Sequence, residues 1–249
     1  MHNPFPPTSQ ALSEPNGLLA SGGDLSVDTL LRAYAQGIFP WFQPNQEILW
    51  WTPDPRMVLR PSDIHISKSL RKTIRKSNWR IQFDTDFAHV VRSCAMTPRQ
   101  EGEVGTWITP AMSRAYQHLH ELGVAHSIEI HDGEKLVGGL YGLLLGRAFF
   151  GESMFSEASD ASKVALVTLA RLCEAHSIEM IDCQVYNPHL ASLGASIIAR
   201  KDFEKYLREA ITEPMSEILR NPACLLPQQA LPLDQRLPAS LPGEVSGLL

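Results

Sequence analysis

The sequence predicts an α+β fold, in which helices pack on a mixed sheet and a small N-terminal domain is attached to a larger one. Three observations favour this class. Strand-like segments on either side of Asp132-Gly133 predict an antiparallel hairpin, because Asp-Gly readily takes a type I′ turn. A long helical pattern from about Ala161 to Ala175, followed by the strand EMIDCQV, predicts a crossover onto the same sheet. The N-terminal region, in contrast, is rich in turn-forming residues.

The N-terminal region contains one clear helix. Ser26 is suited to cap it, and Leu30, Leu31 and Tyr34 lie on its apolar stripe. Gly37 suits the left-handed position that commonly follows the end of a helix. The segments ILWW and RMVLR follow as short strands, so we expect this region to be a small domain with modest regular structure.

Beyond this region the helical and strand-like segments alternate. A basic helix over about 69–76 comes first, then the strand WRIQF and a helix that begins near Phe87. Thr109-Pro110 is typical of the first positions of a helix, and Gly123 is typical of the residue after its end.

The hairpin, the strand RAFF and the crossover helix come next. Asn187-Pro188 then opens a short helix, and the strand ASIIA and the helix DFEKYLREA complete the series. This order of elements is compatible with the architecture of N-acetyltransferase-like (GNAT-like) domains.

The chain is therefore expected to divide into three parts. Residues 1–60 form the small N-terminal domain, and residues 61–212 form the larger, GNAT-like domain. Residues 213–249 contain many prolines and little periodicity, which is typical of a mobile tail. The length of 249 residues is enough to bury a sizeable core.

The composition is that of an ordinary globular protein, with 44% hydrophobic residues, 20% charged residues and a net charge of −5. No apolar run reaches the roughly 18 residues that a membrane span needs, and the N-terminus lacks the pattern of a secretory signal. We therefore expect a cytoplasmic protein with no membrane partner. The four cysteines have no CxxC spacing, so neither a zinc site nor a disulfide framework is indicated.

One short segment departs from the overall negative charge. KSLRKTIRKSNWR contains no acidic residue, and on a helix several of its like charges become i,i+4 neighbours that repel each other. A charge run is usually a solvated helix face, but the absence of interleaved acids favours an anionic ligand such as phosphate. The basic residues are Lys68, Arg71, Lys72, Arg75, Lys76 and Arg80.

Two carboxylates and an amide are candidates for catalysis: Glu152, Asp182 and Gln184. In a strand over about 180–185, the period of two places Asp182 and Gln184 on the same face. Polar groups in an otherwise apolar strand need partners or a function, because burying them unpaired costs roughly 2–7 kcal/mol.

Several common active-site motifs are absent from the sequence. It contains no P-loop, no GxSxG elbow and no HExxH helix, and its nine histidines form no metal pattern. A transferase that uses coenzyme A would need a glycine-rich turn before the crossover helix to bind the pyrophosphate. The segment GESMFSEASDAS at this place has a single glycine and is acidic and apolar. We therefore expect neither a metal nor a cofactor.

A pocket for an apolar side chain, with polar groups at its mouth, is the alternative to a nucleotide site. Such pockets are lined mainly by hydrophobic residues, although the same residue types are more often plain core. The candidate wall residues are Leu140, Phe149, Met154 and Leu166.

Long segments of the chain carry a family resemblance. They are LSEPNGLLASGGDLSVDTLLRAYAQGIFPWF, ILWWTPDPRMVL, EVGTWIT, AHSIE, LVGGLYG, GESMFS, ASKVAL and IDCQVYNPHLASLGA. In this order they strongly resemble the bacterial leucyl/phenylalanyl-tRNA–protein transferase family, from about Ala11 to Leu207. Segments of this length are far more specific than any short motif.

The resemblance implies an enzyme that moves Leu or Phe, and less readily Met, from aminoacyl-tRNA onto the α-amino group of a protein. The implied acceptors begin with Arg or Lys, and the transfer marks them for N-degron proteolysis. The aminoacyl ester already stores the energy, so the reaction implies no ATP and no metal. The enzyme must position the amine, remove a proton and stabilise the oxyanion. We expect it to act as a monomer.

The resemblance also implies roles for single residues. Asp182 would act on the acceptor amine through Gln184, which hydrogen-bonds it, and Glu152 would attract and orient the basic N-terminus. Whether Asp182 is a general base or only polarises Gln184 stays open. Trp41 would stack on the terminal adenine, and Trp107 would lie near the reacting ester. The family pocket for Leu or Phe falls on Leu140, Phe149, Met154 and Leu166, and the acceptor-stem contacts fall on Lys68, Lys72 and Arg75, with Arg71 beside them.

Two other functions compete with this one on the residues alone. A coenzyme A-dependent N-acetyltransferase shares the predicted architecture, although the glycine-poor turn opposes it. A non-catalytic module that binds a tRNA end or a peptide would also use the basic helix and the tryptophans. In that case alanine at Asp182 or Gln184 would not impair function.

Overall fold

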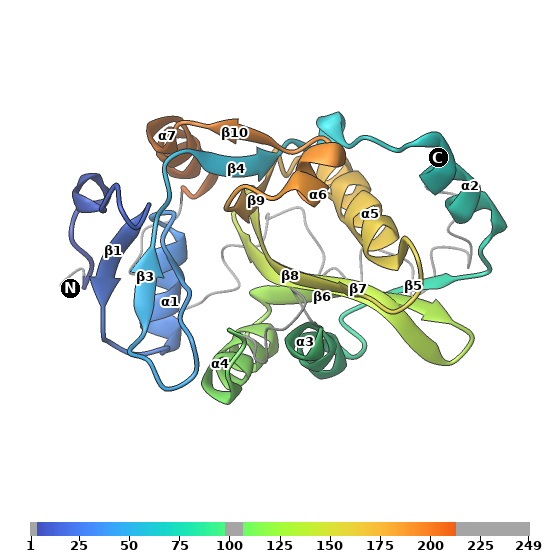
Figure 1. Cartoon of the computed structure of the whole chain (residues 1–249), viewed down its shortest axis with the longest axis horizontal. Helices are drawn as coiled ribbons and strands as arrows, with labels where there is room; N and C mark the ends of the chain where they lie inside the picture. Colours follow the sequence, from blue (N-terminus) through green and yellow to red (C-terminus); the bar gives the residue numbers. More distant parts are fainter. Residues whose placement is uncertain (1–3, 98–106, 213–249) are drawn as a thin grey trace.

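The computed structural model describes residues 4–97 and 107–212. These residues form a three-stranded sheet and a seven-stranded sheet, and helices cover both faces of the larger sheet (Figure 1). The predicted α+β class with a mixed sheet is therefore confirmed. The tail expected over 213–249 lies outside the described residues.

The small sheet belongs to the N-terminal part of the chain. Its strand order is β1-β3-β2, and both pairs are antiparallel. Helix α1 (Val27–Tyr34) lies beside it and begins as predicted, because the Ser26 hydroxyl accepts a hydrogen bond from the Thr29 N–H. The strands are β1 (Leu18–Ser21), β2 (Phe39–Pro40) and β3 (Leu49–Trp51).

The large sheet has the strand order β10-β4-β9-β8-β7-β6-β5. Every neighbouring pair is antiparallel except β8 and β9, which run parallel and are joined by the predicted crossover helix. The strands are β4 (Arg56–Leu59), β5 (Arg80–Phe83), β6 (Ala125–Asp132), β7 (Lys135–Leu145), β8 (Ala148–Ser156), β9 (Met180–Gln184) and β10 (Ser196–Ile198).

Strand β4 falls within the 1–60 range expected for the small domain, but it is an inner strand of the large sheet. It pairs with β10 on one side and with β9 on the other. Met57, Val58 and Leu59 are all buried, as suits a strand that is covered on both faces. The N-terminal segment thus contributes directly to the sheet that carries the catalytic candidates.

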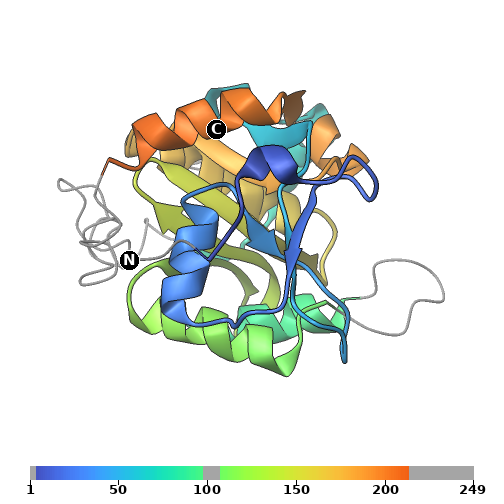
Figure 2. The same ribbon diagram turned by 90° about the vertical axis from the view of Figure 1, so that its left-hand side faces the viewer.

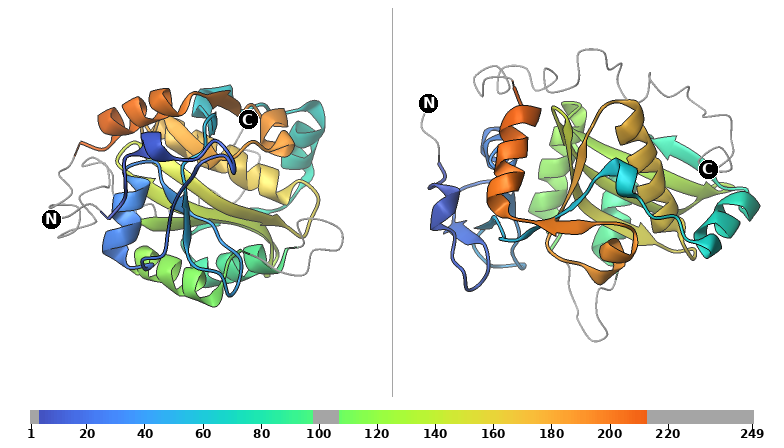
Figure 3. Two further views of the ribbon diagram at one scale, coloured as in Figure 1. Left: turned by 60° about the vertical axis from the view of Figure 1, so that its left-hand side comes forward. Right: turned by 90° about the horizontal axis from the view of Figure 1, so that it is seen from above.

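Helices α3 and α4 pack on one face of the large sheet, and α5 packs on the other face. Figure 2 shows α1 and the small sheet in front of the large sheet, with α7 above and α4 below. Helix α2 lies at the end of the molecule opposite the small sheet (Figure 3). The helices are α2 (Lys68–Lys76), α3 (Phe87–Met96), α4 (Pro110–Glu121), α5 (Ala161–Ala175), α6 (Pro188–Ser192) and α7 (Arg200–Ala210).

Two local details differ from the sequence prediction. Asp132 pairs with Lys135, so the hairpin loop consists of Gly133 and Glu134, one residue later than expected. Gly133 has a φ of +59°, which glycine adopts without strain. The segment GESMFS was expected in a turn, but it continues β8 as far as Ser156, because its backbone stays paired with β7.

Candidate active site

The catalytic candidates line a cavity of about 760 Å³ at the place where β8 and β9 separate. These parallel strands pair from Ala148 and Met180 as far as Phe150 and Asp182. Residues 151–154 of β8 and residues 182–185 at the end of β9 both line the cavity. Separation of two parallel strands inside a sheet leaves backbone and side-chain polar groups free to meet a ligand there.

Irregular pairing on β8 places Glu152. Tyr141 of β7 pairs with Ser153 and Gly142 pairs with Gly151, so Glu152 is the extra residue of a β-bulge. A bulge redirects the side chains on either side of it, and here it allows Glu152 to point toward α1 and α4 while Met154 packs toward α5.

Glu152 is a buried carboxyl group with three donors. Oε1 accepts hydrogen bonds from the Tyr34 hydroxyl at 2.7 Å and from Gln184 Nε2 at 2.9 Å, and Oε2 accepts one from the Tyr116 hydroxyl at 2.7 Å. Burial raises the pKa of Glu152 to about 7, although the bonds from Tyr116 and Tyr34 oppose the rise. Burial also raises the pKa of both tyrosines well above the usual range, so both phenols stay protonated.

Asp182 is held by a buried arginine from β4. Arg56 donates from Nε and Nη2 to the two carboxylate oxygens of Asp182, at 2.8 and 2.6 Å, and the two side chains are 0% and 1% exposed. Arg56 also donates to the Gly37 carbonyl and lies between the rings of Phe39 and Phe203. A bidentate contact of this kind fixes the carboxylate in position and orientation.

Gln184 links the two carboxyl groups. Its backbone N–H donates to Asp182 Oδ1 at 2.9 Å, and its side-chain amide donates to Glu152. The hydrogen bond between Gln184 and Asp182 thus comes from the backbone, and the side chain is bonded to the other acid. Simple alternation along β9 is broken as well, because Met57 pairs with Gln184 and Val58 pairs with Asp182, which makes Cys183 a bulge residue.

Two tryptophans lie at the cavity. Trp41 lines it and is 40% exposed, and its ring centroid is 5.6 Å from that of Trp51, whose indole N–H donates to the Trp41 carbonyl. Trp107 also lines the cavity, but it is only 9% exposed. An exposed indole beside a pocket offers a face for stacking, and a nearly buried one shapes the wall.

The apolar side of the cavity contains most of the predicted wall. Leu140, Met154 and Leu166 line it, and the structure adds Leu169 and Ile181. Phe149, although it pairs with Ile181 of β9, does not line this cavity. Its ring instead lines a separate, much smaller cavity of about 20 Å³.

The basic residues of α2 are not part of the cavity wall. Lys68, Arg71, Lys72 and Arg75 are all exposed, whereas Leu70 and Ile74 on the opposite face of the helix are buried. Within residues 4–97 and 107–212, none of these four cations forms an ion pair with an acidic side chain. Helix α2 therefore presents a face of positive charge to solvent.

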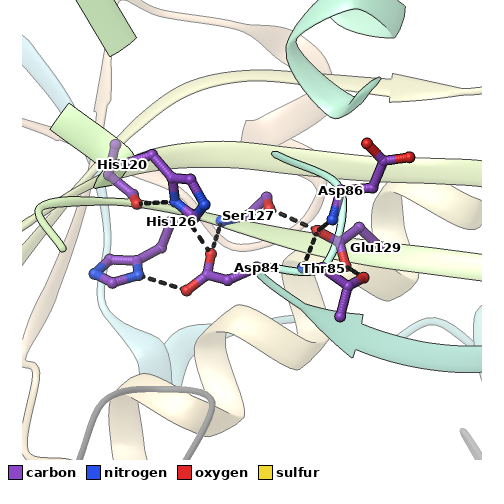
Figure 4. Close-up of polar contacts among 8 residues, drawn as sticks. Asp84, Thr85, Asp86, His120, His126, Ser127 and Glu129 are labelled. Atoms are coloured by element: carbon purple, nitrogen blue, oxygen red, sulfur yellow. Dashed lines mark hydrogen bonds and ion pairs between the residues drawn. The ribbon is translucent and has the colours of Figure 1, made fainter. Parts of the chain in front are cut away.

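A second polar cluster lies on β6 and the turn after β5 (Figure 4). Asp84 Oδ2 lies 2.8 Å from Nδ1 of His126, and Glu129 accepts hydrogen bonds from Thr85 and Ser127. Glu129 also accepts a hydrogen bond from the Asp86 N–H at the start of α3, so it helps to anchor that helix. Among the described residues, no cluster of His, Cys, Asp or Glu side chains is arranged so that it could hold a metal ion.

Sequence reasoning missed three residues of the site. Tyr34 is predicted only on the apolar stripe of its helix, Tyr116 is not singled out within the helix that begins at Thr109-Pro110, and Arg56 is predicted only as part of a short strand. One signal for Arg56 was available, since a cation next to the buried run MVL needs an anionic partner. The two tyrosines gave no such signal, because tyrosine is common in plain cores.

No helix among the described residues is both long enough and apolar enough to cross a lipid bilayer. Among solved structures, the chain is similar to that of L-PGS from Bacillus licheniformis, at 10% identity and a TM-score of 0.39 over 66% of this chain and 55% of that one. A conserved protein of unknown function from Staphylococcus epidermidis matches at 12% identity and a TM-score of 0.36, over 73% of this chain and 68% of that one.

Sequence comparisons cover most of the chain. A protein from Xylella fastidiosa (strain M12) named leucyl/phenylalanyl-tRNA–protein transferase is 54% identical over 212 residues, which are 85% of this chain and 86% of the relative. A protein of the same name from Azoarcus sp. (strain BH72) is 57% identical over 80% of this chain and 84% of its own length. The profile of the leucyl/phenylalanyl-tRNA protein transferase N-terminal domain matches residues 23–54, and that of the leucyl/phenylalanyl-tRNA protein transferase matches residues 58–208. This chain therefore belongs to the leucyl/phenylalanyl-tRNA protein transferase family.

Proposed function

We propose that this protein transfers Leu or Phe from aminoacyl-tRNA to the α-amino group of proteins that begin with Arg or Lys, forming a peptide bond. One observation carries the proposal. A single cavity joins an apolar wall that suits Leu or Phe to a buried carboxyl group and a half-buried amide that suit an amine. The ester bond of aminoacyl-tRNA supplies the energy, so positioning and proton transfer are the tasks left to the protein.

The aminoacyl end of the tRNA occupies the side of the cavity that contains the tryptophans and the apolar wall. Trp41 stacks on the terminal adenine, which its 40% exposure allows. Trp107 lies against the ester, and Leu140, Met154 and Leu166 contact the Leu or Phe side chain. Met is used less readily, but the wall excludes it only weakly, since one methylene in an apolar pocket changes binding by only about 1–3 kcal/mol.

The acceptor amine binds on the opposite side, at Gln184 and Glu152. Gln184 uses its Nε2 on Glu152, so its Oε1 is left to accept a hydrogen bond from the amine. The ionised carboxylate of Glu152 attracts the positive charge of the N-terminal residue. Asp182 acts through Gln184, whose backbone it holds while Arg56 holds Asp182 itself.

The exposed basic face of α2 binds the acceptor stem of the tRNA. Lys68, Lys72 and Arg75, with Arg71 beside them, repel one another along the helix, and phosphate groups relieve that repulsion. The absence of acidic partners among the described residues leaves these cations available for RNA.

Transfer of radiolabelled leucine from leucyl-tRNA to a peptide that begins with Arg tests the function directly. We expect transfer in the presence of EDTA and without ATP, and none to the same peptide with an acetylated N-terminus. Failure to label the free peptide under any condition would reject the proposal. Labelling of the peptide only when acetyl-coenzyme A replaces the tRNA would instead support an N-acetyltransferase.

Alanine at Gln184 or Asp182 separates catalysis from a passive binding role. We expect each variant to lower turnover at least tenfold while tRNA affinity stays nearly unchanged, because neither residue lies on α2. Equal transfer rates in the variants and the wild type would favour a non-catalytic tRNA-end or peptide-binding module.

Several finer features also belong to this proposal. The larger part of the chain is a GNAT-like catalytic domain, with a small domain over residues 1–60. The transfer marks acceptors for N-degron degradation in the cytoplasm, where aminoacyl-tRNA is made. The protein acts as a monomer, which light scattering coupled to size-exclusion chromatography will test.

A further inference from the structure

Glu152, Tyr34 and Tyr116 form a closed ring of four oxygen atoms. The Tyr34 hydroxyl lies 2.7 Å from Glu152 Oε1, the Tyr116 hydroxyl lies 2.7 Å from Oε2, and the two hydroxyls lie 2.5 Å from each other. Each of these three distances is that of an O–H···O hydrogen bond. The ring therefore contains three hydrogen bonds between its oxygen atoms.

Counting hydrogens assigns the protonation state of this ring. Three O–H···O bonds need three hydrogens, and two phenols supply only two of them. The third hydrogen belongs to the carboxyl group. With that hydrogen on Oε2, Oε2 donates to Tyr116, which donates to Tyr34, which donates to Oε1. In the ionised form the first of these bonds is reversed, and Tyr116 donates to Oε2.

The contact from Gln184 supports this arrangement. Gln184 Nε2 donates to Oε1, so Oε1 accepts two hydrogen bonds, as the carbonyl oxygen of a neutral carboxylic acid can. The ionised form lacks the hydrogen between the two phenols, because each phenol then donates to the carboxylate. The 2.5 Å separation of the hydroxyls fits the neutral form.

The surroundings of the ring keep both charge states within reach. The titratable groups that face it are Tyr141 on β7 and Asp182 on β9, and the charge of Asp182 is paired with Arg56 on β4. Burial disfavours the carboxylate, whereas the donors Tyr34, Tyr116 and Gln184 favour it. The resulting pKa of about 7 lets Glu152 exchange its proton near neutral pH.

We propose that the ring of Glu152, Tyr34 and Tyr116 is the proton acceptor for the acceptor α-ammonium group, with Glu152 as the catalytic residue and the two tyrosines as positioning residues. This inference rests on the transfer activity proposed above. It assigns proton removal to a group that lines the cavity and is not paired with a cation, in contrast to Asp182.

The protons balance as follows. The ionised ring, with two hydrogens, takes one proton from the α-ammonium and leaves a neutral amine. The nitrogen lone pair attacks the ester carbonyl, the C–N bond forms, and the bond from the carbonyl carbon to the ribose oxygen breaks. The second proton of the amine passes to that ribose oxygen. The ring then releases the captured proton to solvent, and one proton is set free per turnover.

Infrared difference spectroscopy of the free protein tests the ring without any substrate. Titration of the wild type through neutral pH is expected to remove the C=O stretch of a protonated carboxylic acid. The Glu152→Gln protein is expected to lack that change, and Tyr206→Phe, which alters a tyrosine bonded to the Arg147 carbonyl, is expected to keep it. A band that persists in Glu152→Gln would overturn the assignment.

The pH dependence of kcat tests the role in transfer. At saturating acceptor peptide, kcat reports ionisations in the bound complex. Tyr34→Phe and Tyr116→Phe each remove a donor to the carboxylate, so each is expected to move the lower pH midpoint of kcat upward by about one unit. Tyr206→Phe is expected to leave the midpoint unchanged.

The outcomes separate this inference from the proposed function. If Tyr34→Phe and Tyr116→Phe both fold and both keep the pH midpoint of kcat unchanged, the ring is not the proton acceptor, even if the protein transfers leucine at a high rate. Absence of transfer at every pH, together with the expected infrared change, would reject the proposed function and retain the protonated ring. Circular dichroism and urea unfolding of each variant will verify that the fold is intact.

Discussion

Replacing Arg56 by Met will test how strongly the buried ion pair stabilises the fold. The change leaves the Asp182 carboxylate, which is 1% exposed, without its cation. Removing one partner of a buried pair costs about 3–5 kcal/mol, because the remaining charge is neither solvated nor paired. The variant also loses the contacts of the guanidinium with Phe39 and Phe203, each of which is worth about 0.5–2 kcal/mol.

The expected loss is a large part of the 5–15 kcal/mol that is typical of folded domains. Urea unfolding followed by circular dichroism measures it as a lower transition midpoint at an unchanged slope. The double variant Arg56→Met with Asp182→Leu removes both charges, and we expect it to recover much of the lost stability. Both variants are also expected to lose transfer, since Asp182 is no longer held by Arg56 in the single variant and Gln184 loses its bond to Asp182 in the double variant.

Arg171→Met is the matched control, because Arg171 pairs with Glu174 at 2.8 Å on the surface of α5 and the two side chains are 42% and 36% exposed. An exposed pair contributes about 0–1 kcal/mol, so this variant should unfold almost as the wild type does. Equal losses in Arg56→Met and Arg171→Met would refute the reasoning that burial makes the Arg56 pair strong.

Three further predictions concern Glu152, the tRNA contact and the apolar wall. Burial raises the pKa of Glu152 from 4.5 to about 7, so the protonated carboxyl group adds about 3 kcal/mol to the free energy of unfolding. This contribution is fully present below pH 4.5 and is lost as pH rises through about 7. The stability of the wild type relative to Glu152→Gln should fall across that window in urea unfolding, and a constant difference would contradict the raised pKa. The double variant Lys72→Ala with Arg75→Ala should weaken tRNA binding and reduce the slope of log K against log salt by roughly 1 per lost phosphate contact. Lys135→Ala, on the hairpin, should change neither the affinity nor the slope. An unchanged slope in the double variant would mean that the tRNA binds elsewhere. Met154→Ala removes part of the apolar wall of the cavity, and kcat/KM for leucyl transfer should fall roughly tenfold at unchanged tRNA affinity. An unchanged kcat/KM would show that Met154 does not contact the leucyl side chain.

Local patterns predicted most of the secondary structure. The cap at Ser26, the start of α4 at Thr109-Pro110 and the bounds of α5 agree with the sequence prediction, because each depends on neighbours within one or two turns. The hairpin loop and the length of β8 were less accurate. Both depend on strand register, which the partner strand sets.

The candidate site was predicted in part. Glu152, Asp182 and Gln184 do lie together on one cavity, and five of the six expected substrate-binding residues line it: Trp41, Trp107, Leu140, Met154 and Leu166. Phe149 does not, because its side chain packs in the core and lines a separate, smaller cavity. The sequence could not show which residue bonds to which, since a bulge on each of the two strands changes where the side chains point.

The sequence by itself determined the α+β class, the helix limits, the family and the acids and amide that matter. Only the tertiary structure decided how these groups are paired. Asp182 is hydrogen-bonded to Arg56, which lies 126 residues earlier in the chain, and Glu152 is hydrogen-bonded to Tyr34, which lies 118 residues earlier. No local period links residues so far apart, and their contact follows from the packing of α1 against the large sheet and from the pairing of β4 with β9 inside that sheet. That packing makes one acid a neutralised anchor and leaves the other able to exchange a proton.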